Sequence, residues 1–333
     1  MFGKKTNMNN GLVDRFGRVH DYLRLSITNH CNFACTYCKP DDKNCEKSGS
    51  LLLAEELIEL SKAFVQAGIK KIRLTGGEPL LHKDFERIIE EISRLPVELA
   101  VTTNGYFLDK YFNTLKRNGV QKLNISLDSL KRERFKTITQ RNAFDRVLAN
   151  LILAIKLGFE VKLNAVIMKG VNEDEIIDFA RITNNYNLTV RFIEFMPFKT
   201  NNWNLGKTFS RSNILETLQK TFHLISMDPV AGQTAEYYKI PDAKGKIGLI
   251  STLSHPFCDE CNRIRVMADG KMKNCLFGNK EYDLITPYRQ GKNLFDVIHE
   301  SLASKNAMHG GNHPMHKNSN APNQNRDMFS IGG

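Results

Sequence analysis

Residues 31–38 have the sequence Cys31-Asn32-Phe33-Ala34-Cys35-Thr36-Tyr37-Cys38, and the interpretation of the whole chain starts from them. Three thiols at this spacing predict a tight loop that holds an iron–sulfur cluster. A four-iron cluster normally takes four thiolates, and the next cysteine, Cys45, lies beyond the loop. One iron is therefore expected to stay open to a small molecule. The alternative is a zinc site completed by His30.

Strand-like and helix-like segments alternate around this loop from about residue 21. The expected strands are 22–28, 69–75, 99–103, 122–127, 161–167 and 188–195, and the expected helices are 52–67, 84–95, 110–118, 144–157 and 174–184. Asp84 is expected to cap the N-terminus of the 84–95 helix, and Gly158 is expected to end the 144–157 helix. Such alternation implies a parallel sheet with right-handed crossovers. Six units predict an α/β fold with an incomplete (β/α)6 barrel.

One face of the expected strands is repeatedly polar. Side chains of a strand alternate between its two faces, so these polar residues share one side of the sheet: Arg24, Arg73, Asn124, Lys162 and Arg191. Buried cations need anionic partners. The pattern therefore predicts a wide, wet barrel lumen that binds a polyanion. The alternative is a half-exposed sheet whose charges are solvated, although outer helices would cover its other face.

Composition limits the class of protein. The 333 residues, 41% of them hydrophobic, suffice for one large α/β domain with an extension, or for two domains. The formal charge of +11 indicates an anionic partner but fits nucleic acid, phosphorylated small molecules, acidic surfaces or simply a basic surface. The first ten residues contain no apolar segment, and no run approaches membrane-spanning length, so a cytoplasmic protein is expected. Seven cysteines then indicate metal or redox chemistry rather than disulfides.

A second set of three cysteines lies in the C-terminal region, at Cys258, Cys261 and Cys275. It predicts another cluster with an open iron, or a structural zinc site with His255 as a fourth ligand. Arg263 and Arg265 follow directly, and guanidinium groups suit bidentate phosphate recognition.

The alternation fades after about residue 200. A helix is expected over 209–222 and a β-hairpin over 236–250, whereas residues 305–326 are expected to be irregular. The histidines of that stretch are expected to lie in a flexible polar loop rather than a metal site: His309, His313 and His316.

The first cysteine loop resembles the CxxxCxxC signature of the radical S-adenosylmethionine (SAM) enzymes. Gly76-Gly77-Glu78-Pro79 resembles the segment of those enzymes that contacts the SAM amino group. The two motifs together favour the cluster over zinc. The chain as a whole is similar to the GTP 3′,8-cyclases, the radical SAM family of the first step of molybdenum cofactor biosynthesis. That likeness rests on Arg24, residues 71–79, 102–105, 124–128 and 191–196, the second cysteine set with residues 262–265, and the final Gly332-Gly333.

The resemblance implies roles for individual residues. One [4Fe–4S] cluster, which cleaves SAM, would be held by Cys31, Cys35 and Cys38. A second [4Fe–4S] cluster, whose open iron meets the guanine of GTP, would be held in a C-terminal extension by Cys258, Cys261 and Cys275. SAM would be contacted by Tyr37, Gly77, Glu78, Ser126 and Met196. GTP would be contacted by Arg24, Arg73, Thr102, Lys162, Arg191, Arg263, Ile264 and Arg265. Gly332 and Gly333 would reach the active site as catalytic residues; a diglycine end also suggests a ubiquitin-like carrier, but those are much smaller.

The resemblance also implies an organisation and a reaction. Residues 1–20 would form an N-terminal segment, 21–235 the partial barrel, and 236–333 the C-terminal cluster region with the diglycine tail. Cleavage of SAM would give a radical that takes the 3′ hydrogen of GTP, whose ribose then attacks C8 in a lyase reaction. The implied partners are an external electron donor, the cyclic pyranopterin monophosphate synthase that receives the product, and a second copy in a homodimer, without nucleic acid. Two alternatives remain open, a radical SAM enzyme acting on a peptide and a non-catalytic cluster or zinc protein that binds nucleic acid.

Overall fold

The computed structural model describes residues 11–38, 51–199, 201–311 and 325–332. Four residues named above lie outside these ranges: Cys45, His313, His316 and Gly333.

Six parallel strands form the centre of the fold in sequence order. They are β1 (Tyr22–Ser26), β2 (Lys71–Thr75), β3 (Glu98–Thr103), β4 (Lys122–Ser126), β5 (Glu160–Ile167) and β6 (Thr189–Glu194). Each pairs in parallel with the next. The prediction of an α/β fold with a parallel sheet is confirmed.

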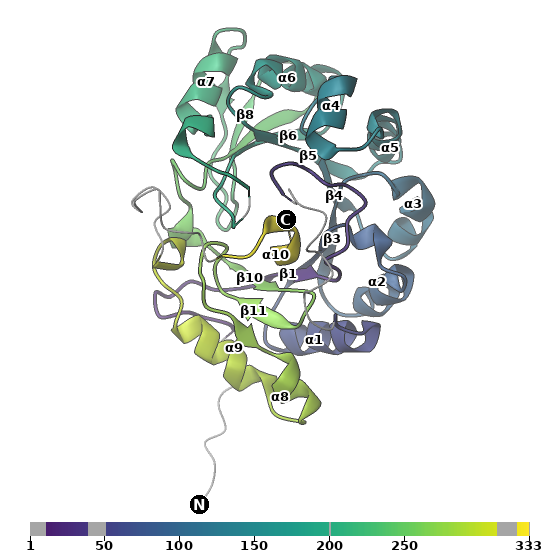
Figure 1. Cartoon of the computed structure of the whole chain (residues 1–333), viewed down its shortest axis with the longest axis vertical. Coiled ribbons are helices and arrows are strands. Elements are labelled where there is room, and N and C mark those ends of the chain that lie inside the picture. Colours follow the sequence, from purple (N-terminus) through teal and green to yellow (C-terminus); the bar gives the residue numbers. More distant parts are fainter. Residues whose placement is uncertain (1–10, 39–50, 200, 312–324, 333) are drawn as a thin grey trace, which may run out of the picture.

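Helices cover the outer side of this curved sheet (Figure 1). They are α1 (Ala54–Gln66), α2 (Phe85–Ser93), α3 (Leu108–Arg117), α4 (Arg132–Thr139), α5 (Phe144–Lys156) and α6 (Ile176–Asn185). Helix α2 illustrates why: Phe85, Ile88, Ile89 and Ile92 recur at helical spacing and are all buried. Asp84 occupies the N-cap position of α2, but its side chain makes no capping hydrogen bond, contrary to the prediction.

The sheet continues beyond both ends of the six-strand set. At one edge, β9 (Lys246–Ile250) pairs in parallel with β6, and β8 (Glu236–Lys239) and β7 (Ile225–Ser226) follow. At the other edge, β10 (Arg263–Val266) pairs in parallel with β1, and β11 (Lys271–Lys273) and β12 (Tyr282–Asp283) follow. The predicted hairpin of β8 and β9 is confirmed. Strands beyond residue 235 thus belong to the same sheet as the barrel strands, while the predicted division of the chain at that residue stays a prediction.

The remaining elements are short or lie near the sheet edges. They are α7 (Arg211–Gln219), α8 (Ile285–Arg289), α9 (Leu294–Ala303), α10 (Met328–Ile331) and the 3-10 helices η2 (Pro79–Leu81), η3 (Glu173–Glu175), η4 (Leu205–Lys207), η5 (Cys258–Glu260) and η6 (His309–Gly311). Figure 1 shows α10 (yellow) inside the curve of the strands, on the side opposite the outer helices. Among the described residues, no helix has the length and apolar character needed to cross a membrane.

Candidate functional site

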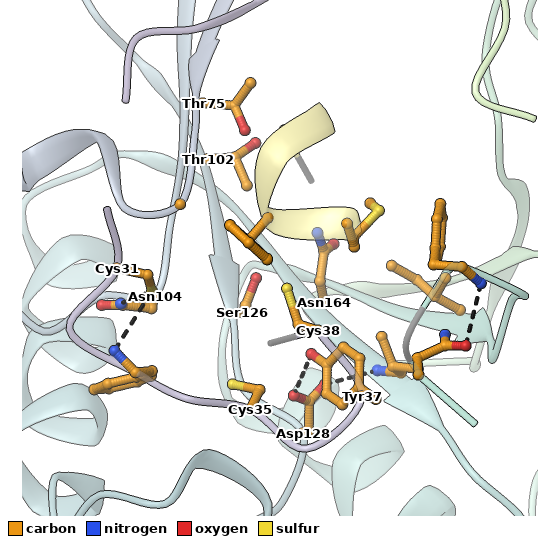
Figure 2. Close-up of a pocket in the computed structure, with 18 of the residues that line it drawn as sticks. Cys31, Cys35, Tyr37, Cys38, Thr75, Thr102, Asn104, Ser126, Asp128 and Asn164 are labelled. Carbon is orange, nitrogen blue, oxygen red and sulfur yellow. Dashed lines mark hydrogen bonds between the residues drawn. The ribbon is translucent and has the colours of Figure 1, made fainter. Parts of the chain in front are cut away.

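The three cysteines of the first loop line one pocket with the carboxyl ends of the parallel strands. We call this the cysteine pocket. The strand ends contribute Thr75, Gly76, Gly77, Thr102, Thr103, Asn104, Ser126, Asp128, Asn164, Val166, Ile193, Glu194, Phe195 and Met196. Figure 2 shows the cysteine side chains around this pocket, with α10 (yellow) beside them. The carboxyl ends of parallel strands are where α/β folds generally place ligands.

The cysteine loop is held by a helix that the sequence analysis missed. The carbonyls of Ile138 and Thr139 in α4 accept hydrogen bonds from the backbone N–H groups of Thr36 and Ala34, at 2.9 and 3.1 Å. Phe33 packs edge-on against Phe135 of the same helix. Thus α4 fixes the backbone from which the thiols project.

The paired glycines after β2 allow the loop to approach closely. A Cβ on Gly76 would lie 2.4 Å from the carbonyl oxygen of Thr28, and one on Gly77 would lie 2.4 Å from the carbonyl oxygen of His30. Gly76 also has a φ of +155°, which side chains rarely adopt. The N–H of Gly77 donates to the Thr28 carbonyl at 2.8 Å, which fastens the two turns together. Glycine is required here for backbone packing.

Glu78, which was predicted to contact SAM, is absent from the lining of the cysteine pocket. It is fully buried, and its carboxylate accepts hydrogen bonds from the Thr103 hydroxyl at 2.8 Å and from the Asn104 N–H at 2.7 Å. Burial raises the pKa of Glu78 to about 7, although these hydrogen bonds act in the opposite direction. Its side chain fixes the turn that carries Gly77.

The other residues predicted to contact SAM do line the cysteine pocket: Tyr37, Gly77, Ser126 and Met196. The Tyr37 hydroxyl donates to Asp128 at 2.7 Å, as the dashed line in Figure 2 shows, and the Val166 N–H donates to the same carboxylate. Burial raises the pKa of Asp128 to about 6. Thr102, predicted to contact GTP, lies in this pocket as well, and its buried hydroxyl oxygen has no hydrogen-bond partner among the described residues.

The chemistry of the first loop fits an iron–sulfur cluster. Three partly buried thiols face one pocket, and the N–H of Phe33 points at the Cys31 sulfur at 3.4 Å. Hydrogen bonds of this kind tune cluster sulfurs. Across the part of the chain that the structure describes, no three His, Cys, Asp or Glu side chains are arranged to hold a metal ion. A cluster gives each thiolate an iron of its own, so its ligands need not converge on one point.

A second pocket, which we call the arginine pocket, is lined by cations from the inner face of the sheet. Arg265 of β10, Arg24 of β1 and Arg73 of β2 are adjacent in register across three neighbouring strands. The same pocket contains Tyr22, Lys71, Lys122, Asn124, Lys162, Arg191 and Arg263. The inward-facing polar residues predicted from alternation are therefore brought together. The cavity has a volume of about 460 Å³, within the ~300–1,000 Å³ common for small-molecule sites.

The arginine pocket has an excess of positive charge: among its described lining residues, one acidic side chain, Glu160, faces nine arginines and lysines. Burial lowers the pKa of Arg24 and of Arg191 to about 10, and it lowers that of Arg265 to about 9, with neighbouring guanidinium groups adding to each shift. Burial alone would raise the pKa of Tyr22, but nearby arginines outweigh it and lower that pKa to about 7. Buried Nη1 of Arg263 and Oδ1 of Asn124 have no hydrogen-bond partner among the described residues. The site suits a multiply charged anion.

The second cysteine set faces the arginine pocket. Cys258 and Cys261 lie at η5, Cys275 follows β11, and all three line the cavity. Burial alone would raise the pKa of Cys261, but Lys305 and Arg263 lower it overall, which favours the thiolate that binds iron. His255, the alternative zinc ligand, is two-thirds exposed and lies 3.4 Å from Glu236. The set therefore fits a cluster whose exposed side faces the cations.

Two other predicted residues lie elsewhere than expected. Ile264 was predicted to contact GTP, but its side chain is fully buried in the core and does not line the arginine pocket. His309 was expected in a flexible loop. It is 1% exposed, its Nε2 lies 2.8 Å from the Thr252 carbonyl oxygen, and its ring packs edge-on against Phe277.

Helix α10 lies where the two pockets meet. Met328 lines both pockets, as do Asn164, Ile193 and Met196. Gly332 follows the helix, and its carbonyl accepts a hydrogen bond from Arg265 at 3.0 Å. A Cβ there would lie 3.0 Å from the Thr75 side chain, so only a residue without a side chain fits easily. The prediction that this segment reaches into the lumen is consistent with the position of Gly332.

Family models match both halves of the chain. The model described as Radical SAM superfamily matches residues 25–182, and the model described as Molybdenum Cofactor Synthesis C matches residues 188–311.

Curated relatives match almost the full chain. A protein named GTP 3′,8-cyclase from Peptoclostridium acidaminophilum is 38% identical over 97% of this chain and 98% of its own length. The mitochondrial GTP 3′,8-cyclase of Arabidopsis thaliana is 41% identical over 97% of this chain and 83% of its own. Molybdenum cofactor biosynthesis protein 1 of Dictyostelium discoideum is 40% identical over 96% of this chain, but this chain spans only 52% of it, about half.

A solved structure shares the fold. The crystal structure of Streptococcus suis SuiB bound to S-adenosylmethionine superposes with a TM-score of 0.62 over 88% of this chain and 68% of that one, at 13% identity. At that identity the likeness concerns the fold alone.

Proposed function

This chain belongs to the GTP 3′,8-cyclase family, and we propose that it carries out that family's reaction. The substrate is GTP, and the product is (8S)-3′,8-cyclo-7,8-dihydroguanosine 5′-triphosphate, in the first step of molybdenum cofactor biosynthesis. The observation that carries the proposal is the register-matched row of Arg265, Arg24 and Arg73, which borders the second cysteine set. Such a row can bind a triphosphate while the base lies toward the thiols.

Two [4Fe–4S] clusters are part of the proposal. Cys31, Cys35 and Cys38 would hold the first, and Cys258, Cys261 and Cys275 the second. When bound, the first cluster with SAM supplies the radical that removes the 3′ hydrogen of GTP.

The protein's own contribution is positioning and exclusion of water. The arginine pocket binds the triphosphate, and its cations fix the ribose relative to the cysteine pocket. Tyr37, Gly77, Ser126 and Met196 shape the pocket proposed for SAM. Helix α10, whose Met328 lines both pockets, would limit solvent where they meet. Close positioning of this kind accelerates a step between two bound molecules and suppresses side reactions.

The wider context is proposed from the family. An external electron donor would reduce the clusters, the cyclic pyranopterin monophosphate synthase would receive the product, and two copies would form a homodimer. Residues 21–235 would act as the SAM-cleaving barrel and 236–333 as the substrate-cluster region. A cytoplasmic location is proposed from the bacterial relative, while the Arabidopsis relative is mitochondrial by name.

The test is anaerobic reconstitution with iron and sulfide, followed by incubation with SAM, dithionite and GTP. Mass spectrometry is expected to find 5′-deoxyadenosine together with the cyclised nucleotide. Deoxyadenosine with unchanged GTP would contradict the substrate and favour another molecule, such as a peptide. Absence of SAM cleavage by protein with both clusters assembled would contradict the reaction itself.

Arg265→Ala tests the nucleotide site separately. One charge-assisted hydrogen bond to phosphate is worth about 1.5–3 kcal/mol, so we expect the Kd for GTP to rise roughly 10- to 100-fold while iron content is unchanged. Equilibrium binding of GTP to reconstituted protein measures this. Arg181→Ala is the matched control, because Arg181 is exposed and, within the described part of the chain, pairs only with Asp178 on the outer helix α6. Equal affinities in the two variants would overturn the role of Arg265.

A further inference from the structure

Lys305 is a buried cation that the proposed reaction does not use. It follows α9 and is 2% exposed. Its Nζ lies 3.5 Å from the sulfur of Cys261 and 3.4 Å from the carbonyl oxygen of Arg263. None of the ion pairs between described residues includes it. A buried ammonium group is costly unless an anion compensates it, and the thiol groups of Cys261 and Cys275 are the acidic groups that act on it most strongly.

Lys305 contacts the second cysteine set but does not line the arginine pocket. The three thiols line the arginine pocket, whereas Lys305 is absent from its lining. The ammonium group therefore contacts the Cys261 sulfur without lining the cavity proposed for GTP. Its effect on the site passes through the sulfur and not through a contact with substrate.

The chain next to Lys305 is fastened to the same cysteine loop. Arg18 donates hydrogen bonds to the carbonyl of Cys258 at 2.7 Å and to the carbonyls of Asn306 and Ala307 at 3.0 and 2.8 Å. Arg18 is itself held by the buried carboxylate of Asp14 at 2.6 Å. The distance between Lys305 and Cys261 is thus set by a network that joins the two segments.

We propose that Lys305 is a positioning residue for the second cluster: its ammonium group donates to the Cys261 thiolate and raises the cluster's reduction potential. The inference rests on the proposed function, since it assumes that Cys258, Cys261 and Cys275 bind a cluster. Three thiolates give such a cluster a net negative charge, and one-electron reduction by the external donor adds another. A nearby positive charge and an N–H···S hydrogen bond both favour the more negative, reduced form.

The test is a potentiometric titration of the reconstituted protein, followed by electron paramagnetic resonance. Lys305→Met keeps the length of the side chain and removes its charge and donor. We expect one of the two cluster reduction steps to move to a more negative potential, while the step of the other cluster stays in place as an internal reference. Lys305→Arg is expected to return the moved step toward its original position. Lys280→Met, at an exposed lysine on the same region, is the matched control and is expected to move neither step.

The outcomes separate the inference from the function it rests on. Both clusters assembled with both potentials unchanged in Lys305→Met would overturn the role of Lys305 and leave the proposed reaction intact. Iron and sulfide for only one cluster in the unaltered protein would overturn the second cluster and the lysine's role together. If Lys305→Met loses the second cluster, Lys305→Gln, which keeps a neutral N–H donor, is titrated instead. A step at more negative potential supports the inference, and an unchanged step contradicts it.

Discussion

Individual charged residues on the inner face of the sheet determine what this protein can bind. Arg24, Arg73 and Arg191 could be assigned to that face from alternation alone, because a strand exposes every second side chain on the same side. Their burial could not be assigned in this way, since it depends on how far the sheet curves. The structure adds a physical consequence, because burial lowers the pKa of Arg24 and of Arg191.

We expect kcat/KM for GTP to depend on pH because of Lys162. Burial, with the nearby Arg191, lowers the pKa of Lys162 to about 8. The ammonium form attracts the triphosphate, so raising the pH through about 8 removes a positive charge and kcat/KM for GTP falls, by at most about tenfold per pH unit. Tyr22, whose pKa is about 7, acts in the same direction because its phenolate adds negative charge.

The pH profile of Lys162→Arg measures the lysine's share. The guanidinium stays charged over this range, so the fall near pH 8 should disappear while the one near pH 7 remains. Tyr22→Phe should show the reverse. A profile identical to that of the unaltered protein in Lys162→Arg would contradict the assignment.

Among the structural elements, the turn after β2 is tightly constrained by backbone packing. It lies against the segment that leads from β1 into the cysteine loop, and the two are joined through Thr28 and His30. The sequence showed the glycines and their relation to the loop, but it assigned Glu78 to the ligand. The carboxylate instead binds the start of the next strand-end loop, at Thr103 and Asn104.

Gly77→Ala is expected to disturb this turn and with it the cysteine loop. The added Cβ would lie 2.4 Å from the His30 carbonyl oxygen, so backbone must move, at a cost of about 3 kcal/mol in the free energy of unfolding. Iron uptake by the first loop should fall with it. Urea unfolding of the metal-free protein and iron analysis after reconstitution measure the two effects.

Gly119→Ala is the control for that substitution. Gly119 has a φ of +68° but no atom within 4 Å of a Cβ, so only backbone strain of about 1 kcal/mol is expected, with normal iron uptake. If the two alanine variants lose the same stability and bind iron equally, close packing at Gly77 is not what holds the loop.

Helix α4 shows why some elements escape prediction. It has eight residues, and only Phe135, Ile138 and Thr139 are buried, so its apolar pattern is too brief to recognise. Short helices are marginal alone and depend on tertiary contacts. The contacts of α4 are with distant segments: the cysteine loop, Phe144 of α5 and, through Arg134, the acidic residues of η3. No local pattern in the sequence encodes them.

In the complete fold, the order of the β/α units was predictable and the edges of the sheet were not. Local periodicity identifies each strand and helix separately. The pairing of β10 with β1 joins Arg265 to Arg24 across most of the chain, and no local pattern encodes it. The second cysteine set was predicted, but its place beside the arginine row depends on that pairing. The position of Lys305 beside Cys261 could not be predicted from the sequence, because single lysines are common in polar segments.

The wall shared by the two pockets has a consequence for energetics. Met196 and Met328 line both cavities, so a molecule in one changes the packing that the other meets. Thermodynamic linkage requires the effect to be mutual: the factor by which SAM alters the dissociation constant of GTP must equal the factor by which GTP alters that of SAM. Typical couplings are about 5- to 150-fold. Calorimetry of each ligand with and without the other measures both factors, and a value of one for both would mean that the shared wall transmits nothing.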